Sequence, residues 1–218
     1  MILETRAAAP FYKNGYLLAC EATREGIVID PGDEIQELQD LVESLGVAVR
    51  HILLTHGHVD HVAGVALARR VFGAPVSLHR ADLPLYEQAA AQADFFGITV
   101  EPPPPPDRFY GECPPIVFAG YAVAVLPTPG HTPGGVCLHV THPIEGNLGL
   151  FAGDTLFAGS IGRTDLPGGD YDRLMASIRG TILTLPDQTA VYPGHGPKTT
   201  VGAERLGNPF ILTHSPRG

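Results

Sequence analysis

Short apolar runs separated by turn residues predict a mixed α/β fold. In the first half of the chain, β-branched-rich runs predict strands over residues 2–8, 16–20, 26–30, 51–55 and 75–78. Later runs predict strands over residues 116–120, 121–126, 135–140, 148–152 and 189–192. Helical periodicity or propensity predicts helices over residues 34–45, 62–72, 81–93, 171–185 and 199–206. Two packed sheets with helices on their outer faces would bury these apolar stripes.

Local signals refine this picture at a few positions. Asp33 is the expected N-cap of the first helix, and Gly46 is its expected stop. Five prolines at 102–106 predict a stiff, extended segment, with an SH3-type ligand as the less favoured alternative. The chain shows no internal repeat and no strong boundary. We therefore expect a single domain over residues 1–218.

Composition narrows the class of protein. The net charge of −9 argues against a nucleic-acid partner, because such proteins need a concentrated basic surface. The three cysteines, Cys20, Cys113 and Cys137, are widely spaced and predict free buried thiols in a reducing compartment. No apolar run has the length of a signal peptide or of a membrane span. These features predict a cytoplasmic protein without a membrane partner.

The densest chemical signal is the run His56-Gly57-His58-Val59-Asp60-His61 between a predicted strand and a predicted helix. In an extended segment, residues two apart point to the same side, so His56 and His58 can face one point. Asp60 and His61 can face a second point as the chain turns into the helix. Imidazoles and carboxylates are ligands that suit zinc, iron or manganese. This cluster therefore predicts a metal site.

Three later turns follow apolar strands and each carries one residue of the same ligand type. His131 lies in a Pro-Gly-His-Thr-Pro-Gly turn, Asp154 follows Gly153, and His195 lies in a Pro-Gly-His-Gly turn. Glycine and proline restrict these turns, so each side chain is held by a stiff backbone. One such turn would be weak evidence, but the recurrence of the pattern favours a shared metal-binding role.

The order T-H-x-H-x-D-H, P-G-H-T-P-G, G-D and P-G-H-G resembles the metallo-β-lactamase superfamily, and within it the short glyoxalase II-like (hydroxyacylglutathione hydrolase-like) subgroup. The resemblance spans residues 14–195. It implies an α/β (α+β) fold of the metallo-β-lactamase type, a four-layer αββα sandwich with a metal site at one edge of the paired sheets.

The resemblance also implies the ligand set. His56, His58 and His131 match a first metal site, Asp60, His61 and His195 match a second, and Asp154 matches the carboxylate that bridges them. Two zinc ions about 3.5–4 Å apart would then hold a bridging hydroxide at neutral pH. That hydroxide would attack an acyl thioester of glutathione or a similar thiol, and Asp60 could orient it as a catalytic residue. The thiolate leaving group needs little acid assistance.

Other members of the superfamily remain alternatives. The Gly-Arg-Thr-Asp run at 162–165 is similar to short glyoxalase II-like hydrolases and also to persulfide dioxygenases. A dioxygenase would hold one iron with His56, His131 and Asp154. A lactonase could share all seven ligands. A β-lactamase, a nuclease and a non-catalytic binding module are less favoured.

Candidate substrate contacts come from the remaining turns. Only 23 residues (218 − 195) follow His195, fewer than the helical extension that supplies much of the glutathione site in full-length glyoxalase II. Arg163, Lys198 and Tyr171 are possible substitutes. For each of them, an ordinary structural or surface role is the alternative, and Arg163 could instead pair with Asp165.

Overall fold

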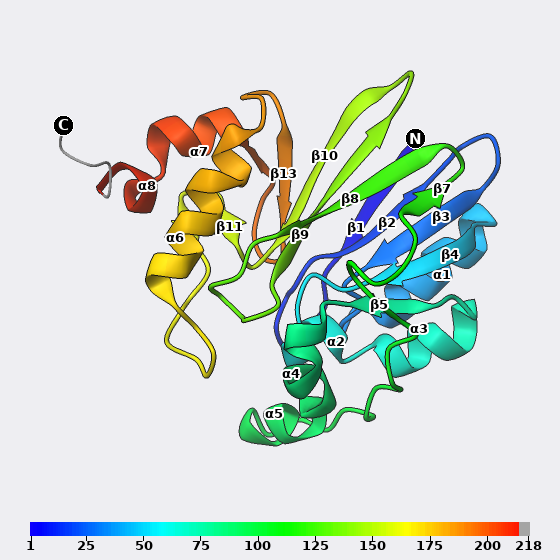
Figure 1. The fold of residues 1–218 in the computed structure, drawn as a ribbon. Coiled ribbons are helices and arrows are strands. Elements are labelled where there is room, and N and C mark those ends of the chain that lie inside the picture. The colour runs from blue at the N-terminus through cyan, green and yellow to red at the C-terminus, as the bar shows by residue number, and fades with distance from the viewer. Residues whose placement is uncertain (214–218) are drawn as a thin grey trace. The chain divides into compact units, whose positions relative to one another are not determined.

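The computed structural model describes residues 1–213 and divides into two compact units, Met1–Tyr121 and Ala122–Gly218 (Figure 1). In the first unit, one sheet has the strand order β1-β2-β3-β4-β5-β6. Its strands are β1 (Ile2–Arg6), β2 (Gly15–Ala19), β3 (Glu25–Ile29), β4 (Ala48–Leu53), β5 (Val76–Leu78) and β6 (Arg108–Phe109). β1, β2 and β3 pair antiparallel, whereas β3 to β6 pair in parallel.

Helices cover the parallel part of this sheet because parallel neighbours need crossover connections. α1 (Ile35–Leu45) joins β3 to β4, and α3 (Val65–Phe72) lies between β4 and β5. Leu38 and Val42 of α1 and Val65 of α3 join the strand residues in one buried apolar cluster. The unit also contains β7 (Ile116–Phe118). This core fixes the ends of β3 and β4, which carry the candidate site.

The first helix differs from the prediction at its start. Its N-cap is Glu34, which makes no capping bond with its side chain, so the expectation that Asp33 caps the helix is wrong. Its end is as predicted, because Gly46 adopts the left-handed conformation (φ 62°) and its N–H bonds to carbonyls of the last turn.

The helix predicted over 62–72 is interrupted. α2 (Val59–Val62) ends before Gly64, and α3 begins after it. The backbone N–H of Gly64 donates to the carbonyl of Pro31 at 3.0 Å. A Cβ at position 64 would lie 2.3 Å from the carbonyl oxygen of Gly32. The close approach of this turn breaks the helix, and apolar periodicity alone could not reveal it.

The helix predicted over 81–93 consists of shorter pieces: a 3₁₀ turn η1 (Arg80–Asp82), α4 (Leu83–Glu87) and α5 (Ala89–Phe95). The proline-rich segment that follows is fixed at both ends to α3, through Arg70–Glu101 and Arg69–Asp107 ion pairs. Its middle accepts a 2.6 Å hydrogen bond from the Tyr86 hydroxyl to the carbonyl of Pro104. The proline-rich segment is therefore an ordered loop within the unit, as the favoured prediction of a stiff, extended segment implied.

The second unit contains a sheet in which β14, β13, β10, β9 and β8 are neighbours in that order. The strands are β8 (Tyr121–Pro127), β9 (Val136–His142), β10 (Gly146–Gly153), β13 (Ala190–Pro193) and β14 (Thr199–Thr200). β10 and β13 pair in parallel, and the other pairs are antiparallel. α6 (Tyr171–Gly180) and α7 (Val201–Gly207) bury Leu174, Ile178 and Val201 against the sheet.

Several helices of the second unit are shorter than predicted from the sequence, and some elements were not predicted. The helix predicted over 171–185 ends at Gly180, and a 3₁₀ turn η2 (Ile182–Thr184) follows. The helix predicted over 199–206 begins only at Val201, after the two residues of β14. The sequence did not predict a small hairpin of β11 (Leu156–Phe157) and β12 (Ser160–Ile161), or helix α8 (Pro209–Thr213).

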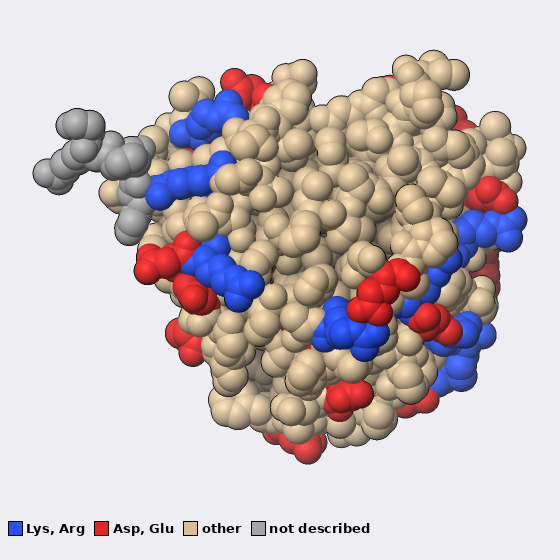
Figure 2. Space-filling view, viewed as in Figure 1, with Lys and Arg blue, Asp and Glu red and all other residues tan. Residues whose placement is uncertain are grey.

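The burial of the cysteines and the distribution of charged side chains can be compared with the predictions from composition. All three cysteines are free thiols, but only Cys137 is buried, so the prediction of buried thiols is wrong for Cys20 and Cys113. On the face shown in Figure 2, acidic and basic side chains are interspersed rather than gathered by sign. Across residues 1–213, no helix combines the length and apolar character needed to cross a bilayer.

Candidate metal centre

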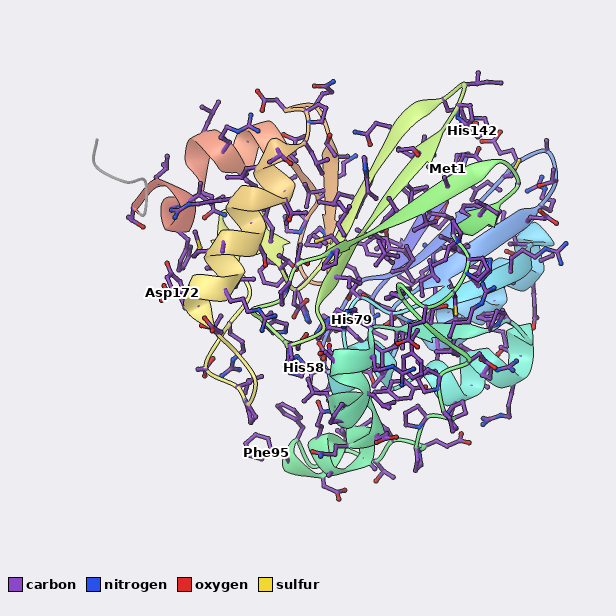
Figure 3. All side chains as sticks on the ribbon, in the orientation of Figure 1. Met1, His58, His79, Phe95, His142 and Asp172 are labelled. Carbon is purple, nitrogen blue, oxygen red and sulfur yellow. The ribbon has the colours of Figure 1, made fainter. Side chains whose placement is uncertain are left out.

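Four of the seven predicted ligands follow β4 in the first unit: His56 and His58 precede α2, and Asp60 and His61 lie within it. His58 is the N-cap of α2 and has extended backbone angles (φ −71°, ψ 150°). The centroid of the His56 ring lies 4.9 Å from that of His58 and 4.0 Å from that of His61. His58 is labelled in Figure 3. Oδ2 of Asp60 lies 3.6 Å from Nε2 of His61. The turn gathers three imidazoles and a carboxylate in a small volume.

The backbone of this turn is held from the side by the segment that contains η1, α4 and α5. The N–H of Gly57 donates to Oδ2 of Asp82 at 3.0 Å. The Gln92 side chain accepts from the N–H of Val59 at 3.0 Å and donates to the carbonyl of Gly57 at 3.3 Å. A Cβ at Gly57 would lie 2.9 Å from the carbonyl oxygen of Asp82. Glycine between the two histidines permits this close packing.

Asp30 supports the histidines from behind, a role that the sequence analysis did not predict. Its buried carboxylate accepts hydrogen bonds from the N–H and hydroxyl of Thr55, both at 2.7 Å, and from Nδ1 of His61 at 2.9 Å. The Thr55 hydroxyl also lies 3.1 Å from Nδ1 of His56. A carboxylate on Nδ1 leaves Nε2 of His61 as the nitrogen that can bind a metal, the arrangement common in metal sites.

A buried ion pair holds the loop that carries Asp30. Nζ of Lys13 lies 2.7 Å from Oε1 of Glu34, and both side chains are almost fully buried. The same lysine donates to the carbonyl of Asp30, and the N–H of Gly32 donates to Glu34 at 2.9 Å. Asp30 itself has a positive φ of 49°. The surrounding hydrogen bonds stabilise this uncommon conformation.

Asp33 is the acidic neighbour of this loop. Burial raises the pKa of the Asp33 carboxyl to about 6, and the nearby charges of Glu34 and Asp60 act in the same direction. Lys13 opposes the shift. The charge of the Asp33 carboxyl is therefore sensitive to pH close to neutrality.

The other three predicted ligands lie at strand ends of the second unit. β10 and β13 are parallel, with Gly153 opposite Pro193, so Asp154 and His195 leave the sheet at the same edge. Oδ2 of Asp154 lies 3.7 Å from Nε2 of His195 and 3.7 Å from Nε2 of His131. His131 follows β8 on the turn after Gly130. One carboxylate oxygen therefore lies at the same distance from two imidazoles.

His131 is oriented by the backbone. Its Nδ1 donates to the carbonyl of Arg163 at 2.7 Å, which leaves Nε2 toward Asp154. Gly130 permits the turn before it: its φ is 140°, and a Cβ there would lie 2.2 Å from the backbone nitrogen of Leu174. This turn is thus built against the start of α6.

The distances between the candidate ligand atoms suit a shared metal ion better than direct hydrogen bonds between the side chains. The separations of 3.6–3.7 Å exceed the hydrogen-bond range. They are closer to the roughly 3.3 Å expected between two ligands of one tetrahedral zinc ion. In His61 and His131 the second ring nitrogen is engaged by a carboxylate or a carbonyl, as in established metal ligands. Each unit therefore carries a set of side chains suited to metal binding.

The three candidate substrate contacts lie in different settings. Arg163 forms a bidentate ion pair with Asp165, at 2.8 and 2.6 Å, and this pairing lowers the pKa of Asp165 to about 2. Both side chains are exposed. Tyr171 begins α6 and packs against the core of its unit. Lys198 is exposed, three residues after His195. The guanidinium and the ammonium thus remain on the surface.

Comparison with known proteins identifies the family. The model of the metallo-β-lactamase superfamily matches residues 8–195. The chain is 36% identical to hydroxyacylglutathione hydrolase GloC of Haemophilus influenzae over 217 residues, which cover 99% of this chain and 100% of the relative.

Solved structures agree on the fold. The B3 metallo-β-lactamase BLEG-1 is 35% identical, with a TM-score of 0.87, over 96% of this chain and 99% of that one. TTHA1623 in a di-iron-bound form is 41% identical, with a TM-score of 0.81, over 95% and 99%. ETHE1 from Myxococcus xanthus is 26% identical, with a TM-score of 0.78, over 99% and 86%.

These matches confirm the predicted fold class and its glyoxalase II-like resemblance. The chain carries a His/Asp cluster of the kind that is typical of metal sites in this fold. The chain therefore belongs to the metallo-β-lactamase superfamily, as a metallo-hydrolase.

Proposed function

We propose that the chain is a two-metal thioesterase that hydrolyses an acyl thioester of glutathione or a similar thiol. His56, His58 and His131 would hold the first metal, and Asp60, His61 and His195 the second. Asp154 would bridge them. Water and the thioester are consumed, and a carboxylic acid and a free thiol are released.

The observation that carries this proposal is the position of Asp154. Its Oδ2 is 3.7 Å from Nε2 of His131, a ligand assigned to the first metal, and 3.7 Å from Nε2 of His195, assigned to the second. A carboxylate that bridges two ions needs this symmetric placement between ligands of different sites. A site for one metal has no such requirement.

A bound pair of divalent metals supplies a hydroxide nucleophile near neutral pH and polarises the acyl carbonyl. The protein's own contribution is orientation. Asp30 and the Arg163 carbonyl fix the ring planes of His61 and His131 through their Nδ1 atoms. Asp60 is mostly buried beside His61, where its carboxylate could orient the nucleophile. No strong general acid is needed, because a thiolate is a good leaving group.

The substrate class rests on GloC, a relative that this chain matches over both full lengths. Arg163 and Lys198 are exposed cations that could bind the carboxylates of a glutathione-like thiol, and Tyr171 could contact its apolar part. For Arg163 to bind a carboxylate, its ion pair with Asp165 would have to exchange. We further propose a small-molecule partner only, and a cytoplasmic location.

A chelation experiment tests the function. Metal-free protein should lose hydrolysis of S-acyl glutathione, and zinc should restore it in proportion to occupancy, up to two ions per chain. Thioester hydrolysis that survives complete metal removal would refute the proposal. So would a fully loaded protein that turns over a lactone or a β-lactam and no thioester.

A mononuclear-iron persulfide dioxygenase is the second candidate, with His56, His131 and Asp154 as iron ligands. The likeness to ETHE1 over 99% of this chain supports it. TTHA1623, solved in a di-iron-bound form, supports iron as the metal but with two ions rather than one. Metal analysis of protein purified without added metal distinguishes the two. One iron per chain, with oxygen uptake on glutathione persulfide, would favour the dioxygenase.

A further inference from the structure

The hairpin of β11 and β12 contacts the three candidate metal ligands of the second unit, His131, Asp154 and His195, although it carries none of them itself. The ring of Phe157, in β11, packs edge-on against that of His195, with centroids 6.3 Å apart. Just after β12, a Cβ at Gly162 would lie 1.9 Å from the carbonyl oxygen of Asp154 and 3.2 Å from Cβ of His131. The position of this hairpin thus affects all three donors.

Arg163, which follows Gly162, links the hairpin to His131 through its backbone. The Arg163 carbonyl accepts the 2.7 Å hydrogen bond from Nδ1 of His131. A shift of the hairpin by a fraction of an ångström would move this carbonyl and rotate the imidazole. The hairpin has two residues in each strand, and such a ribbon is not stable by itself. Something outside it must therefore fix its position.

The last helices provide that support. The N–H of Gly159, in the hairpin loop, donates to Oε2 of Glu204 on α7 at 2.9 Å. Nδ2 of Asn208 donates to the carbonyl of Ser160 at 3.0 Å and to Oε2 of Glu204 at 2.8 Å. The hydroxyl of Thr199 donates to Oε1 of Glu204 at 2.6 Å. Both carboxylate oxygens of Glu204 therefore accept hydrogen bonds. One partner, Gly159, belongs to the hairpin, and another, Asn208, is itself hydrogen-bonded to the hairpin.

The burial of these side chains argues for a specific role. Glu204 is 4% exposed and Asn208 is fully buried. A buried carboxylate is costly unless hydrogen bonds compensate for lost water. A leucine of similar size would fill the same space but would leave the N–H of Gly159 and Nδ2 of Asn208 without this acceptor. The site therefore requires a hydrogen-bond acceptor at position 204, and packing alone does not explain it.

We infer that Glu204, together with Asn208, is a positioning residue for the metal centre: it fixes the hairpin that orients His131 and His195. The inference rests on the proposed metal-binding role of those histidines, but not on the identity of the substrate. The hydrogen bonds of Glu204 go to Gly159, Thr199 and Asn208 rather than to a candidate metal ligand. Its effect on metal binding would therefore pass through the Gly159 backbone and the Arg163 carbonyl.

The test compares Glu204→Leu with Leu206→Ala, a change on the same helix at a side chain that is 79% exposed. Zinc affinity is measured by competition with a chelator on metal-free protein, and the cobalt absorption spectrum reports ligand geometry. Loss of a hydrogen-bond partner of a metal ligand typically weakens metal binding 10–100-fold. Because Glu204 acts one step further away, we expect about a 10-fold loss and an altered cobalt spectrum. Leu206→Ala should match the wild type in both.

A purely structural role gives a different result. Glu204→Leu would then lower the melting temperature of the metal-free protein while zinc affinity stays within two-fold of the wild type, and this overturns the inference. If Glu204→Leu does not fold, Asn208→Ala provides the same comparison, and unchanged affinity in that variant overturns it equally. A wild type that binds two zincs without thioester turnover refutes the proposed function alone, because affinity still tests Glu204.

Discussion

Oδ2 of Asp30 accepts a hydrogen bond from Nδ1 of His61 at 2.9 Å, with both side chains buried. This bond fixes the tautomer and ring plane of a proposed metal ligand. The same carboxylate binds the N–H and hydroxyl of Thr55. A residue outside the sequence motif thus determines how two residues of the motif are oriented.

Replacement of Asp30 should weaken the metal centre. In Asp30→Asn, an NH₂ group replaces one of two acceptor oxygens and faces a donor. We expect zinc affinity to fall roughly 10–100-fold, as for other hydrogen-bond partners of metal ligands. The measurement is chelator competition on the purified variant. Asp40→Asn, at an exposed carboxylate of α1, is the control, and equal affinities in the two variants would contradict the assigned role.

Asp154→Asn should change metal stoichiometry. The bridging role requires a carboxylate between His131 and His195, and an amide cannot offer two anionic oxygens to two cations. We expect the number of tightly bound zinc ions per chain to fall from two to one or fewer, with loss of thioesterase activity. Elemental analysis after dialysis measures this. Two retained ions would rule out the bridge.

The buried Lys13–Glu34 pair should matter for stability. In Lys13→Met, the Glu34 carboxylate would remain buried without its cation, which typically costs about 3–5 kcal/mol of unfolding free energy. Denaturant unfolding of metal-free protein measures the loss. Glu34→Gln in the same background should recover part of it, because the unpaired charge is removed.

An exposed pair provides the comparison. Arg70 and Glu101 are both more than half exposed. Arg70→Met should therefore cost less than about 1 kcal/mol. Similar losses for Lys13→Met and Arg70→Met would show that the buried pair contributes no more than a surface one.

The stability of metal-free protein should depend on Asp33. Its pKa is about 6 in the folded state, raised mainly by burial, against 3.8 for an ordinary aspartate. The folded state then binds more protons than the unfolded state between these values, so this residue lowers stability as pH rises through that window. Asp33→Asn should raise the melting temperature at pH 8 and have little effect at pH 3.5. An equal effect at both pH values would exclude this titration.

Much of the fold could be predicted from the sequence, because it depends on local patterns. Alternating apolar runs place the strands, and Gly46 ends its helix as glycine should. The candidate donors were also chosen from local patterns: four from one His/Asp-rich run, and three from turns that contain glycine. Whether they bind the metals as grouped above stays a prediction.

What the sequence could not reveal depends on contacts between distant segments. The helix break at Gly64 follows from its approach to Gly32. The role of Asp30 depends on a positive φ, and that of Glu204 on a hairpin too short to leave a periodic signal. Burial of Cys20 and Cys113 was inferred from residue type alone, and the local chain path leaves them partly exposed instead.

The approach of Gly64 to the loop at Gly32 has a consequence for how this chain can vary. An added residue between His61 and Gly64 would push a side chain or a longer backbone into the carbonyl of Gly32, 2.3 Å from where a Cβ would stand. The spacing from the metal motif to α3 is therefore fixed in length. Insertions that preserve folding must fall in segments with open surroundings, such as the tip at Gly146, where an added Cβ meets no atom within 4 Å.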